Sequence, residues 1–205
     1  MAEATDYRMS FSTGGLFLRE SVELAKLYQE LADWDLVKKR SSSSNLLQTR
    51  TRASSTRAIR EIVFRLQKLT SAELELLIEG SAQDQKYLLW ISVCRTYPFI
   101  GEFAVEILHE YYITMRGELQ YEDFDYFFNK KADLISQLDE ISSTTRDKLR
   151  QVLFRMMREA DLLTPGNTIQ PAMFTPHLIQ VVSNNAQKDL QCFPVFEDEI
   201  RSVKL

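Results

Sequence analysis

Hydrophobic residues in positions 53–69 recur at the spacing of an amphipathic helix. One stripe of this helix carries the apolar residues Ile59, Ile62, Val63, Leu66 and Leu69. The opposite side carries Arg57, Arg60, Phe64 and Lys68. We expect the helix to start after Ser54, whose hydroxyl can accept hydrogen bonds from the free N–H groups of the first turn. The pattern therefore predicts a helix with a buried apolar face and a cationic outer face.

The same pattern recurs 90 residues further along the chain. Residues 143–159 align with residues 53–69 without a gap, and the apolar stripe then falls on Leu149, Val152, Leu153 and Met156. This offset also pairs Asp33-Trp34-Asp35 with Asp123-Phe124-Asp125. Each copy has a long helix, a short helix opened by the Asp-aromatic-Asp motif, a connection and a basic helix, which is typical of a helix-turn-helix module with its supporting helix. The alternative is coincidence, because amphipathic helices converge easily.

The remaining pattern predicts a mainly α, compact multi-helix protein. Only 6 Gly and 5 Pro interrupt 205 residues, which favours long helices over many short strands. Further helices are expected at 15–31, 33–40, 71–79, 82–96, 98–115 with Gly117 as its C-cap, 121–131, 143–161, 177–183 and 186–191. The helix at 82–96 is apolar nearly all round, so we expect it at the centre of the core.

The chain is expected to form two lobes, residues 1–97 with a first module and basic helix 54–69, and residues 98–205 with a second module. Turn residues at 165–167 predict a small β-hairpin, or wing, over 164–175, or only an extended loop, because Pro171 would interrupt a strand. An apolar strap at 192–196 should pack back on the body.

Charge is distributed unevenly along the chain. The net charge is −4, yet residues 38–68 contain nine Lys or Arg and a single acid, Glu61. A cationic stretch in an acidic protein is typical of a chain that holds a polyanion on one side. A solvated helix face is the alternative, but stability alone would favour mixed signs at i,i+4 spacing.

The two basic helices therefore supply candidate nucleic-acid contacts. In helix-turn-helix proteins the first turns of the second helix meet the major groove, while flanking cations contact phosphates. The candidates in the first module are Lys38, Lys39, Arg40, Arg50, Arg52, Ser54, Ser55, Thr56, Arg57, Arg60 and Lys68. Those in the second are Thr144, Thr145, Arg146, Lys148 and Arg150. Phe64 and Phe154, on the outer side, are expected to pack against neighbouring helices.

Catalytic and cofactor chemistry finds little support in the sequence. It contains no Gly-rich phosphate loop, no Cys/His set at metal spacing and no Ser-His-Asp arrangement. We therefore expect no enzyme activity, no cofactor and no metal. Cys94 and Cys192 are interpreted as reduced thiols, and no signal peptide or membrane span is expected, so the predicted location is cytoplasmic.

Several sequence blocks resemble the BrxA family, a core component of BREX bacteriophage-exclusion systems. They are SFSTGGLFLRES at 10–21, NLLQTRTRASSTRAIREI at 45–62, FIGEFAVEIL at 99–108, FDYFFNKKA at 124–132 and TTRDKLRQVLFRMMREADLL at 144–163. The resemblance implies a small helical protein of prokaryotes that binds double-stranded DNA. It also implies partners: an adenine methyltransferase, a large ATPase and a phosphatase-like protein. Its fold would be similar to helical RNA-binding antitermination proteins.

Two functional hypotheses remain open. The first is a monomeric double-stranded DNA-binding component of a BREX-type defence system, with RNA binding as a variant. The second is a protein-interaction adaptor within the defence complex, in which the cationic helix meets an acidic protein surface.

Overall fold

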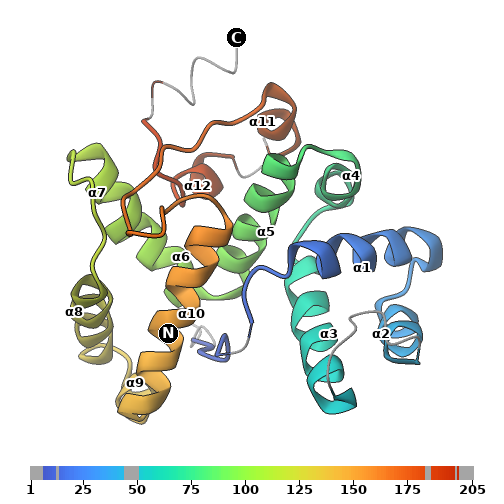
Figure 1. Cartoon of the computed structure of the whole chain (residues 1–205), viewed down its shortest axis with the longest axis horizontal. Coiled ribbons are helices and arrows are strands. Elements are labelled where there is room, and N and C mark those ends of the chain that lie inside the picture. Colours follow the sequence, from blue (N-terminus) through green and yellow to red (C-terminus); the bar gives the residue numbers. More distant parts are fainter. Residues whose placement is uncertain (1–6, 13, 44–50, 183–185, 197, 199–205) are drawn as a thin grey trace, which may run out of the picture.

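The computed structural model describes residues 7–12, 14–43, 51–182, 186–196 and 198, and in these the chain is mainly helical (Figure 1). The predicted fold class is confirmed. The helices are α1 (Leu18–Leu31), α2 (Trp34–Ser43), α3 (Arg52–Leu66), α4 (Ser71–Glu79), α5 (Ala82–Thr96), α6 (Pro98–Phe103), η1 (Ala104–His109, a π-helix), α7 (Glu110–Ile113), α8 (Tyr121–Ala132), α9 (Ser136–Asp139), α10 (Ser143–Glu159), α11 (Pro176–Val182) and α12 (Ala186–Leu190).

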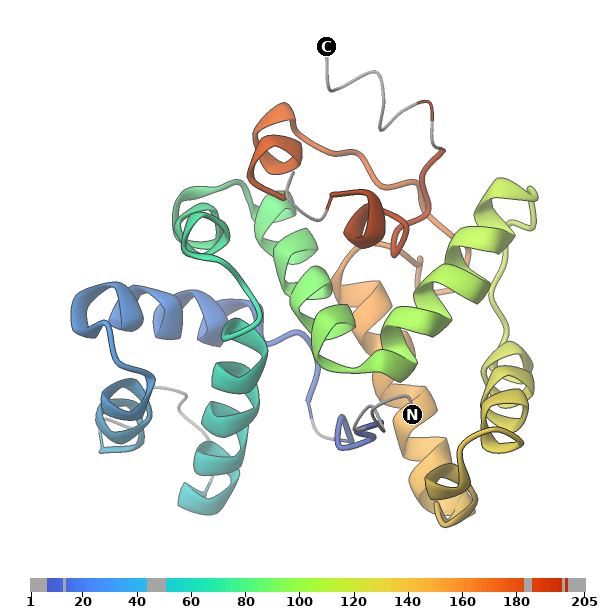
Figure 2. The ribbon, with the colours of Figure 1, turned by 180° about the vertical axis from the view of Figure 1, so that it is seen from behind.

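Helix α5 occupies the middle of the molecule, as its all-round apolar character predicts. In Figures 1 and 2 it lies between α1–α3 on one side and α6, α10 and α12 on the other. Leu88, Trp90 and Ile91 are completely buried. The Trp90 indole N–H donates to the Cys192 carbonyl at 2.9 Å, which fixes the predicted C-terminal strap on the body. Cys94 and Cys192 are buried and unbridged.

A single apolar core joins the two predicted lobes. It runs from Leu24 and Ile62 in the first half of the chain to Phe99 and Leu153 in the second. The boundary predicted after residue 97 falls between α5 and α6, where Tyr97 is buried. The division into 1–97 and 98–205 stays a prediction, as does the helix-turn-helix character of the modules.

Local start signals fix several helices where the sequence places them. Thr70 and Glu73 form a capping box before α4, and Ser81 and Asp84 form another before α5. Asp33 caps α2, because its Oδ1 accepts from the N–H groups of Asp35 and Leu36 at 2.7 and 3.1 Å.

The predicted start of α3 and the predicted role of Asp123 are wrong, whereas the predicted start of α8 is confirmed. Helix α3 begins at Arg52, three residues earlier than a cap at Ser54 allows, because Thr51 is extended and its hydroxyl accepts from the Ser54 N–H at 3.2 Å. Helix α8 begins at Tyr121 after Gln120, and the Asp123 carboxylate accepts from the Gln120 N–H at 2.7 Å. Asp123 thus occupies the third helical position, whereas Asp33 is itself a cap, so the two motifs are not equivalent.

The helix predicted over 98–115 is interrupted and ends early. The π-helical turn of η1 separates α6 from α7. Gly117 is not its C-cap. The chain instead leaves the helix through Met115, which adopts a left-handed φ of 62°, and the Arg116 N–H donates to the Tyr111 carbonyl at 2.8 Å.

A tight hairpin stands at the start of residues 164–175, where the Thr164 N–H donates to the Thr168 carbonyl and the Gln170 N–H to the Leu162 carbonyl, both at 2.9 Å. Its role as a wing stays a prediction. Asn167 adopts a φ of 64° in the predicted turn, and its carbonyl accepts from the Leu119 N–H at 3.0 Å. Two isolated bridges, Glu118–Thr168 and Leu163–Ile169, are the only β-structure in the described part of the chain. Ile169 is buried, so this segment serves the core.

Arg95 of α5 ties α4 and α12 to the centre. Its guanidinium donates to both carboxylate oxygens of Glu73, at 2.6 and 2.8 Å, and to those of Asp189, at 2.7 and 3.1 Å. Burial on its own raises the pKa of Glu73, but hydrogen bonds from Arg95 and Thr70 outweigh it and hold the pKa below its usual value.

This network predicts acid sensitivity. Because the pKa of Glu73 is lower in the folded than in the unfolded chain, its stabilising effect is complete above the unfolded value of about 4.3 and is lost as the pH falls through the folded value. Urea unfolding should therefore show the wild type losing stability more steeply below about pH 4.5 than a Glu73→Gln variant. Parallel losses in the two proteins would contradict this role for Glu73.

Candidate nucleic-acid interface

Helix α3 presents the two faces that its sequence predicts. Ile59, Ile62 and Leu66 are at most 1% exposed, whereas Arg57 and Arg60 are exposed on the outer side. The apolar stripe therefore anchors the helix, and burial of each such side chain contributes on the order of 2 kcal/mol. The outer cations are left at the surface.

The N-terminal arm, which we define as residues 7–12 and 14–16, links the two basic helices. The Gly15 carbonyl accepts from the Arg65 guanidinium of α3 at 2.7 Å. The next N–H, that of Leu16, donates to the Glu159 carboxylate at the end of α10 at 2.6 Å. A Cβ at Gly15 would lie 2.1 Å from that carboxylate, so a larger residue there would have to displace the Glu159 side chain.

Aromatic packing and one hydrogen bond hold the first residues of the arm, between Tyr7 and Phe11, against the body. Phe11 is completely buried, with its ring 5.3 Å from that of Tyr97. The Tyr7 hydroxyl donates to Glu102 at 2.7 Å. These contacts place the arm opposite the outer side of α3.

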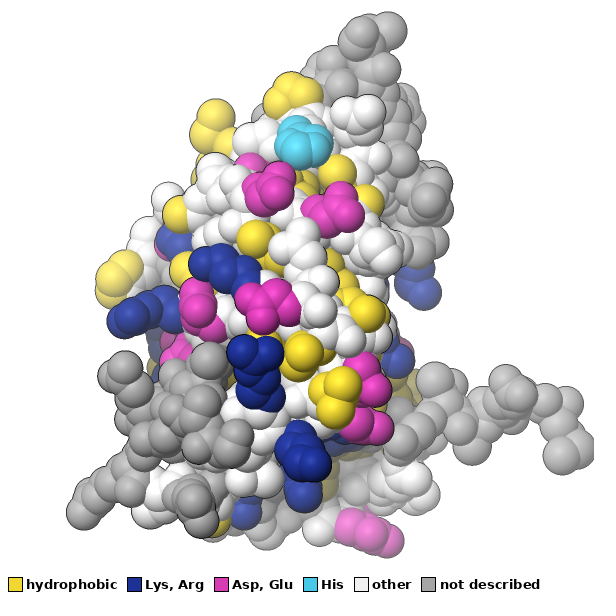
Figure 3. Space-filling view, turned by 90° about the vertical axis from the view of Figure 1, so that its right-hand side faces the viewer, with side chains coloured by type: hydrophobic (Ala, Val, Ile, Leu, Met, Phe, Trp, Pro, Cys, Tyr) yellow, Lys and Arg dark blue, Asp and Glu magenta, His cyan; other side chains and the backbone are white. Residues whose placement is uncertain are grey.

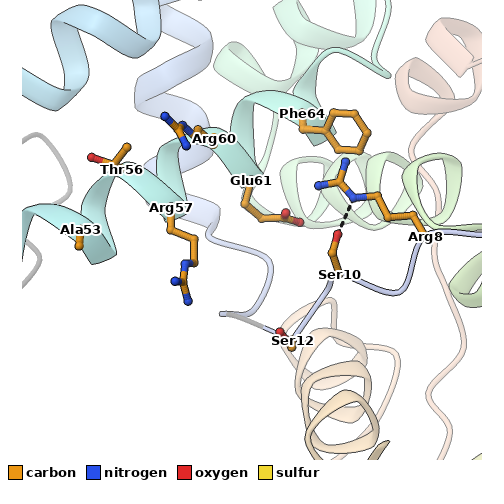
Figure 4. Close-up of a pocket in the computed structure, with 9 residues that line it drawn as sticks. All are labelled: Arg8, Ser10, Ser12, Ala53, Thr56, Arg57, Arg60, Glu61 and Phe64. Carbon is orange, nitrogen blue, oxygen red and sulfur yellow. Dashed lines mark hydrogen bonds between the residues drawn. The ribbon is translucent and has the colours of Figure 1, made fainter. Parts of the chain in front are cut away.

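A cavity of about 780 Å³ lies between α3 and the arm (Figure 4). It is lined by Arg8, Ser10, Ser12, Ala53, Thr56, Arg57, Arg60, Glu61 and Phe64. Figure 4 shows Ala53, Thr56, Arg57, Arg60, Glu61 and Phe64 on the α3 ribbon and Arg8, Ser10 and Ser12 facing them from the arm. Three guanidinium groups and three hydroxyls therefore surround one hollow.

Arg8 is fixed against the aromatic ring on this surface. Its guanidinium carbon lies 4.0 Å from the centre of the Phe64 ring, and it donates a hydrogen bond to the Ser10 hydroxyl. Phe64 was expected to pack against a neighbouring helix. It packs instead against the arm, because Arg8 covers the ring. Phe154, its counterpart in α10, is completely buried and meets Tyr121 of α8, as expected.

Among the described residues of the cavity wall, the one acid is already neutralised. Glu61 is 8% exposed and accepts from Arg65 Nε at 2.7 Å and from the Tyr97 hydroxyl. Burial, together with the nearby Glu61 charge, raises the pKa of Tyr97 against the opposing effect of Arg65, so the hydroxyl keeps its proton and donates. The lining side chains therefore leave the cavity with a positive field.

The other predicted residues of the first module are distributed unevenly. Lys38 pairs with Asp35 at 2.5 Å, and Arg40 lies 3.7 Å from Glu30. The side of the molecule that carries α1 and α2 accordingly mixes both signs of charge (Figure 3).

The remaining predicted residues of this module differ in exposure. Lys39, Ser54 and Lys68 are exposed, and Thr56 lines the cavity. Ser55 is only 4% exposed, which removes its hydroxyl from the surface. Arg50 lies outside the described residues, and only the backbone of Arg52 is described.

The second basic helix has most of its charge paired. Asp125 of α8 accepts from Arg146 Nε at 3.1 Å and also binds Arg150, which in turn pairs with Asp147 at 2.9 Å. Arg146 also lies over the Phe128 ring at 4.6 Å. Thr144, Thr145 and Lys148 are exposed. The sequence did not indicate this neutralisation, because Asp125 comes from another helix.

Asp125 therefore sets how much positive charge α10 presents. An Asp125→Asn variant should remove the carboxylate that Arg146 and Arg150 share, leaving Arg150 with Asp147 alone, and raise the affinity for duplex DNA by about threefold to tenfold at low salt. Fluorescence anisotropy would measure this, with Asp139→Asn as the control, because Asp139 is an exposed acid of α9 and its loss changes the net charge equally. Equal gains in the two variants would show that the effect is only long-range charge.

Among the described residues, neither a metal-binding group nor a membrane-spanning helix is found. They contain no group of three or more His, Cys, Asp or Glu arranged to hold a metal ion. None of their helices is both long enough and apolar enough to cross a membrane.

The fold and the cavity define an all-helical protein with a cationic surface helix. Comparison with known proteins places it: the chain belongs to the BrxA family, whose sequence profile matches residues 5–186. It is similar to the BREX protein BrxA of Escherichia coli O9:H4 (strain HS), with 24% identity over 86% of this chain and 84% of that one. A second relative, the BREX protein BrxA of Bacillus cereus (strain H3081.97), is 25% identical over 62% of this chain and 64% of that one.

A solved structure has the same fold. It is the crystal structure of an uncharacterized protein from Magnetospirillum magneticum, with a TM-score of 0.76 and 19% identity. The match covers 92% of this chain and 98% of that one. At this identity the likeness concerns the fold alone.

Proposed function

We propose that the chain is a non-enzymatic component of a BREX-type anti-phage defence system and that it binds double-stranded DNA through the outer side of α3. Its family membership and the names of its two relatives support the first part. The proposal includes a cytoplasmic monomer that works beside the methyltransferase, the ATPase and the phosphatase-like protein of such systems.

The observation that carries the DNA-binding part is the surface of α3. Arg57 and Arg60 are exposed on a cavity whose one acid among the described lining residues, Glu61, is buried and paired with Arg65. Unpaired cations on one side of an acidic protein attract a polyanion, because phosphates release bound counterions on contact. Lys39 of α2, Ser54 and Thr56 of α3, and Lys68 after the end of α3 extend the proposed interface.

Helix α10 takes a secondary part in this proposal. Its exposed Thr144, Thr145 and Lys148 are available to phosphates, whereas Arg146 and Arg150 must first leave Asp125. Phosphate contacts position a duplex without reading its sequence, so the interface is proposed to bind many sequences.

A groove on another part of the surface favours the adaptor hypothesis as a second function. This groove, of about 610 Å³, lies between α4 and α11 and is lined by Ala72, Glu75, Leu76, Glu79, Gly80, His177, Gln180 and Val181. Where α4 and α11 meet, hydrophobic side chains lie between acidic ones (Figure 3). An apolar floor with acidic edges suits a basic helix of a partner protein.

Binding of the full chain to duplex DNA, duplex RNA and an acidic polypeptide of equal charge would test the proposal. We expect the duplex DNA to bind and the acidic polypeptide to bind far more weakly, because phosphates along a duplex are more densely spaced. Equal binding of the polypeptide would favour the adaptor, and a preference for duplex RNA would overturn the assignment to DNA.

A further inference from the structure

We propose that the cavity between α3 and the N-terminal arm holds one unpaired strand of nucleic acid, and that Arg8 is a binding residue for that strand. The inference rests on the proposed function, because it concerns the same surface. It adds a ligand class, a strand that leaves a duplex, and a residue that the sequence did not indicate.

The position of the cavity favours one strand over two. The hollow of about 780 Å³ is flanked by α3 and by the arm, so a ligand inside it contacts both walls. A duplex carries its two strands on either side of a major groove of about 12 Å. It would lie along the exposed side of α3, whereas a single sugar-phosphate backbone can run between the two walls.

The lining also matches a strand. Proteins that bind single strands combine a cationic groove along the backbone with aromatic or guanidinium planes. Here Arg57 and Arg60 line one wall and Arg8 the other, with hydroxyls of Ser10 and Ser12 beside Arg8. The Arg8 guanidinium, spread over the Phe64 ring, presents a flat cationic surface to the cavity.

The arm holds Arg8 in place before any ligand arrives. Tyr7, next to Arg8, is 7% exposed and bonded to Glu102, and Phe11 is completely buried. Gly15 and Leu16 then fix the arm to Arg65 and Glu159. An ordered wall lowers the entropic cost of closing on a strand.

Because of the position of Arg8, binding of an unpaired strand can be measured separately from duplex binding. A duplex on the outer side of α3 contacts Arg57 and Arg60, whereas a strand inside the cavity contacts Arg8 as well. An Arg8→Gln variant should therefore weaken only the contribution of the unpaired strand.

The experiment compares a blunt DNA duplex with the same duplex carrying an overhang of about eight nucleotides, within the range that single-strand sites cover. Fluorescence anisotropy at low salt would give both affinities for the wild type, Arg8→Gln and the control Arg19→Gln, which alters an exposed arginine of α1. Thermal unfolding would check that the variants stay folded.

We expect the overhang to raise wild-type affinity at least about fivefold. Arg8→Gln should remove this gain while leaving blunt-duplex affinity within about twofold, and Arg19→Gln should keep both. No gain from the overhang, or a gain that survives Arg8→Gln, would overturn the inference and leave duplex binding standing. Overhang binding that depends on Arg8 without any blunt-duplex binding would support the inference and remove the proposed duplex function.

Discussion

Replacing Arg57 and Arg60 together by Glu is expected to abolish duplex binding. Both side chains are exposed on α3, and both line the cavity, in which the acid that the structure describes, Glu61, is paired with Arg65. Each phosphate contact contributes about one unit to the slope of log affinity against log salt. Loss of two contacts, with two new negative charges facing phosphates, should lower affinity at least about 100-fold at low salt. Fluorescence anisotropy with a blunt duplex would measure it.

The control for this variant must carry the same change in net charge. Arg19→Glu with Lys188→Glu provides it, because both residues are exposed and lie on α1 and α12, outside the proposed interface. Measured at about 0.1 M salt, where the Debye length is about 10 Å, the control should bind within about threefold of the wild type, since more distant exposed charges are largely screened. Equal losses in the two double variants would mean that overall charge, and not α3, governs binding.

Replacing Arg65 by Met should have the largest effect on stability. Arg65 is 2% exposed, pairs with Glu61 at 2.7 Å and donates to the Gly15 carbonyl. Removing the guanidinium leaves a buried carboxylate without its cation and the arm without its donor, which costs about 3–5 kcal/mol. Urea unfolding at neutral pH would measure the loss.

Two further variants test whether the loss of stability comes from the buried ion pair of Arg65 and Glu61. Arg155→Met changes the aligned residue of α10, which is exposed, so its free energy of unfolding should change by no more than about 0.5 kcal/mol. A Glu61→Leu and Arg65→Met double variant should be more stable than Arg65→Met alone, because no buried charge is left unpaired. If Arg65→Met were as stable as Arg155→Met, the ion pair would have no structural role.

Local signals explain why much of the fold could be predicted from the sequence. The capping boxes at Thr70 and Ser81 act within four residues, so α4 and α5 have the expected bounds. The start of α3 was misplaced because Thr51 and Ser54 are both good cap residues, and only backbone geometry shows that Thr51 is used.

The 90-residue repeat predicted burial better than surface chemistry. Ile59 and Leu149, and likewise Val63 and Leu153, are buried in both copies. The copies differ at Arg65, which is buried, and Arg155, which is exposed. Helical periodicity fixes which face is apolar, but it does not show whether a distant carboxylate meets an arginine.

Contacts between distant segments explain what the sequence did not indicate at the site. Arg8 precedes the first helix, and its place beside Phe64 follows from an arm anchored by Phe11, Gly15 and Leu16. Contacts of this kind depend on the tertiary fold, and the spacing of residues along the chain does not indicate them. The signal that could have indicated the arm is Gly14-Gly15, since adjacent glycines often mark a close backbone approach.

The salt dependence of duplex binding tests the central claim most directly. The full chain would be titrated with a blunt duplex at several salt concentrations between roughly 50 and 200 mM, a range over which phosphate contacts weaken measurably. We predict a linear decrease of log affinity with log salt, with a slope of about −3 or steeper, as expected when Arg57, Arg60 and at least one further cation neutralise phosphates. A slope near zero, or no binding at the lowest salt, would contradict the account.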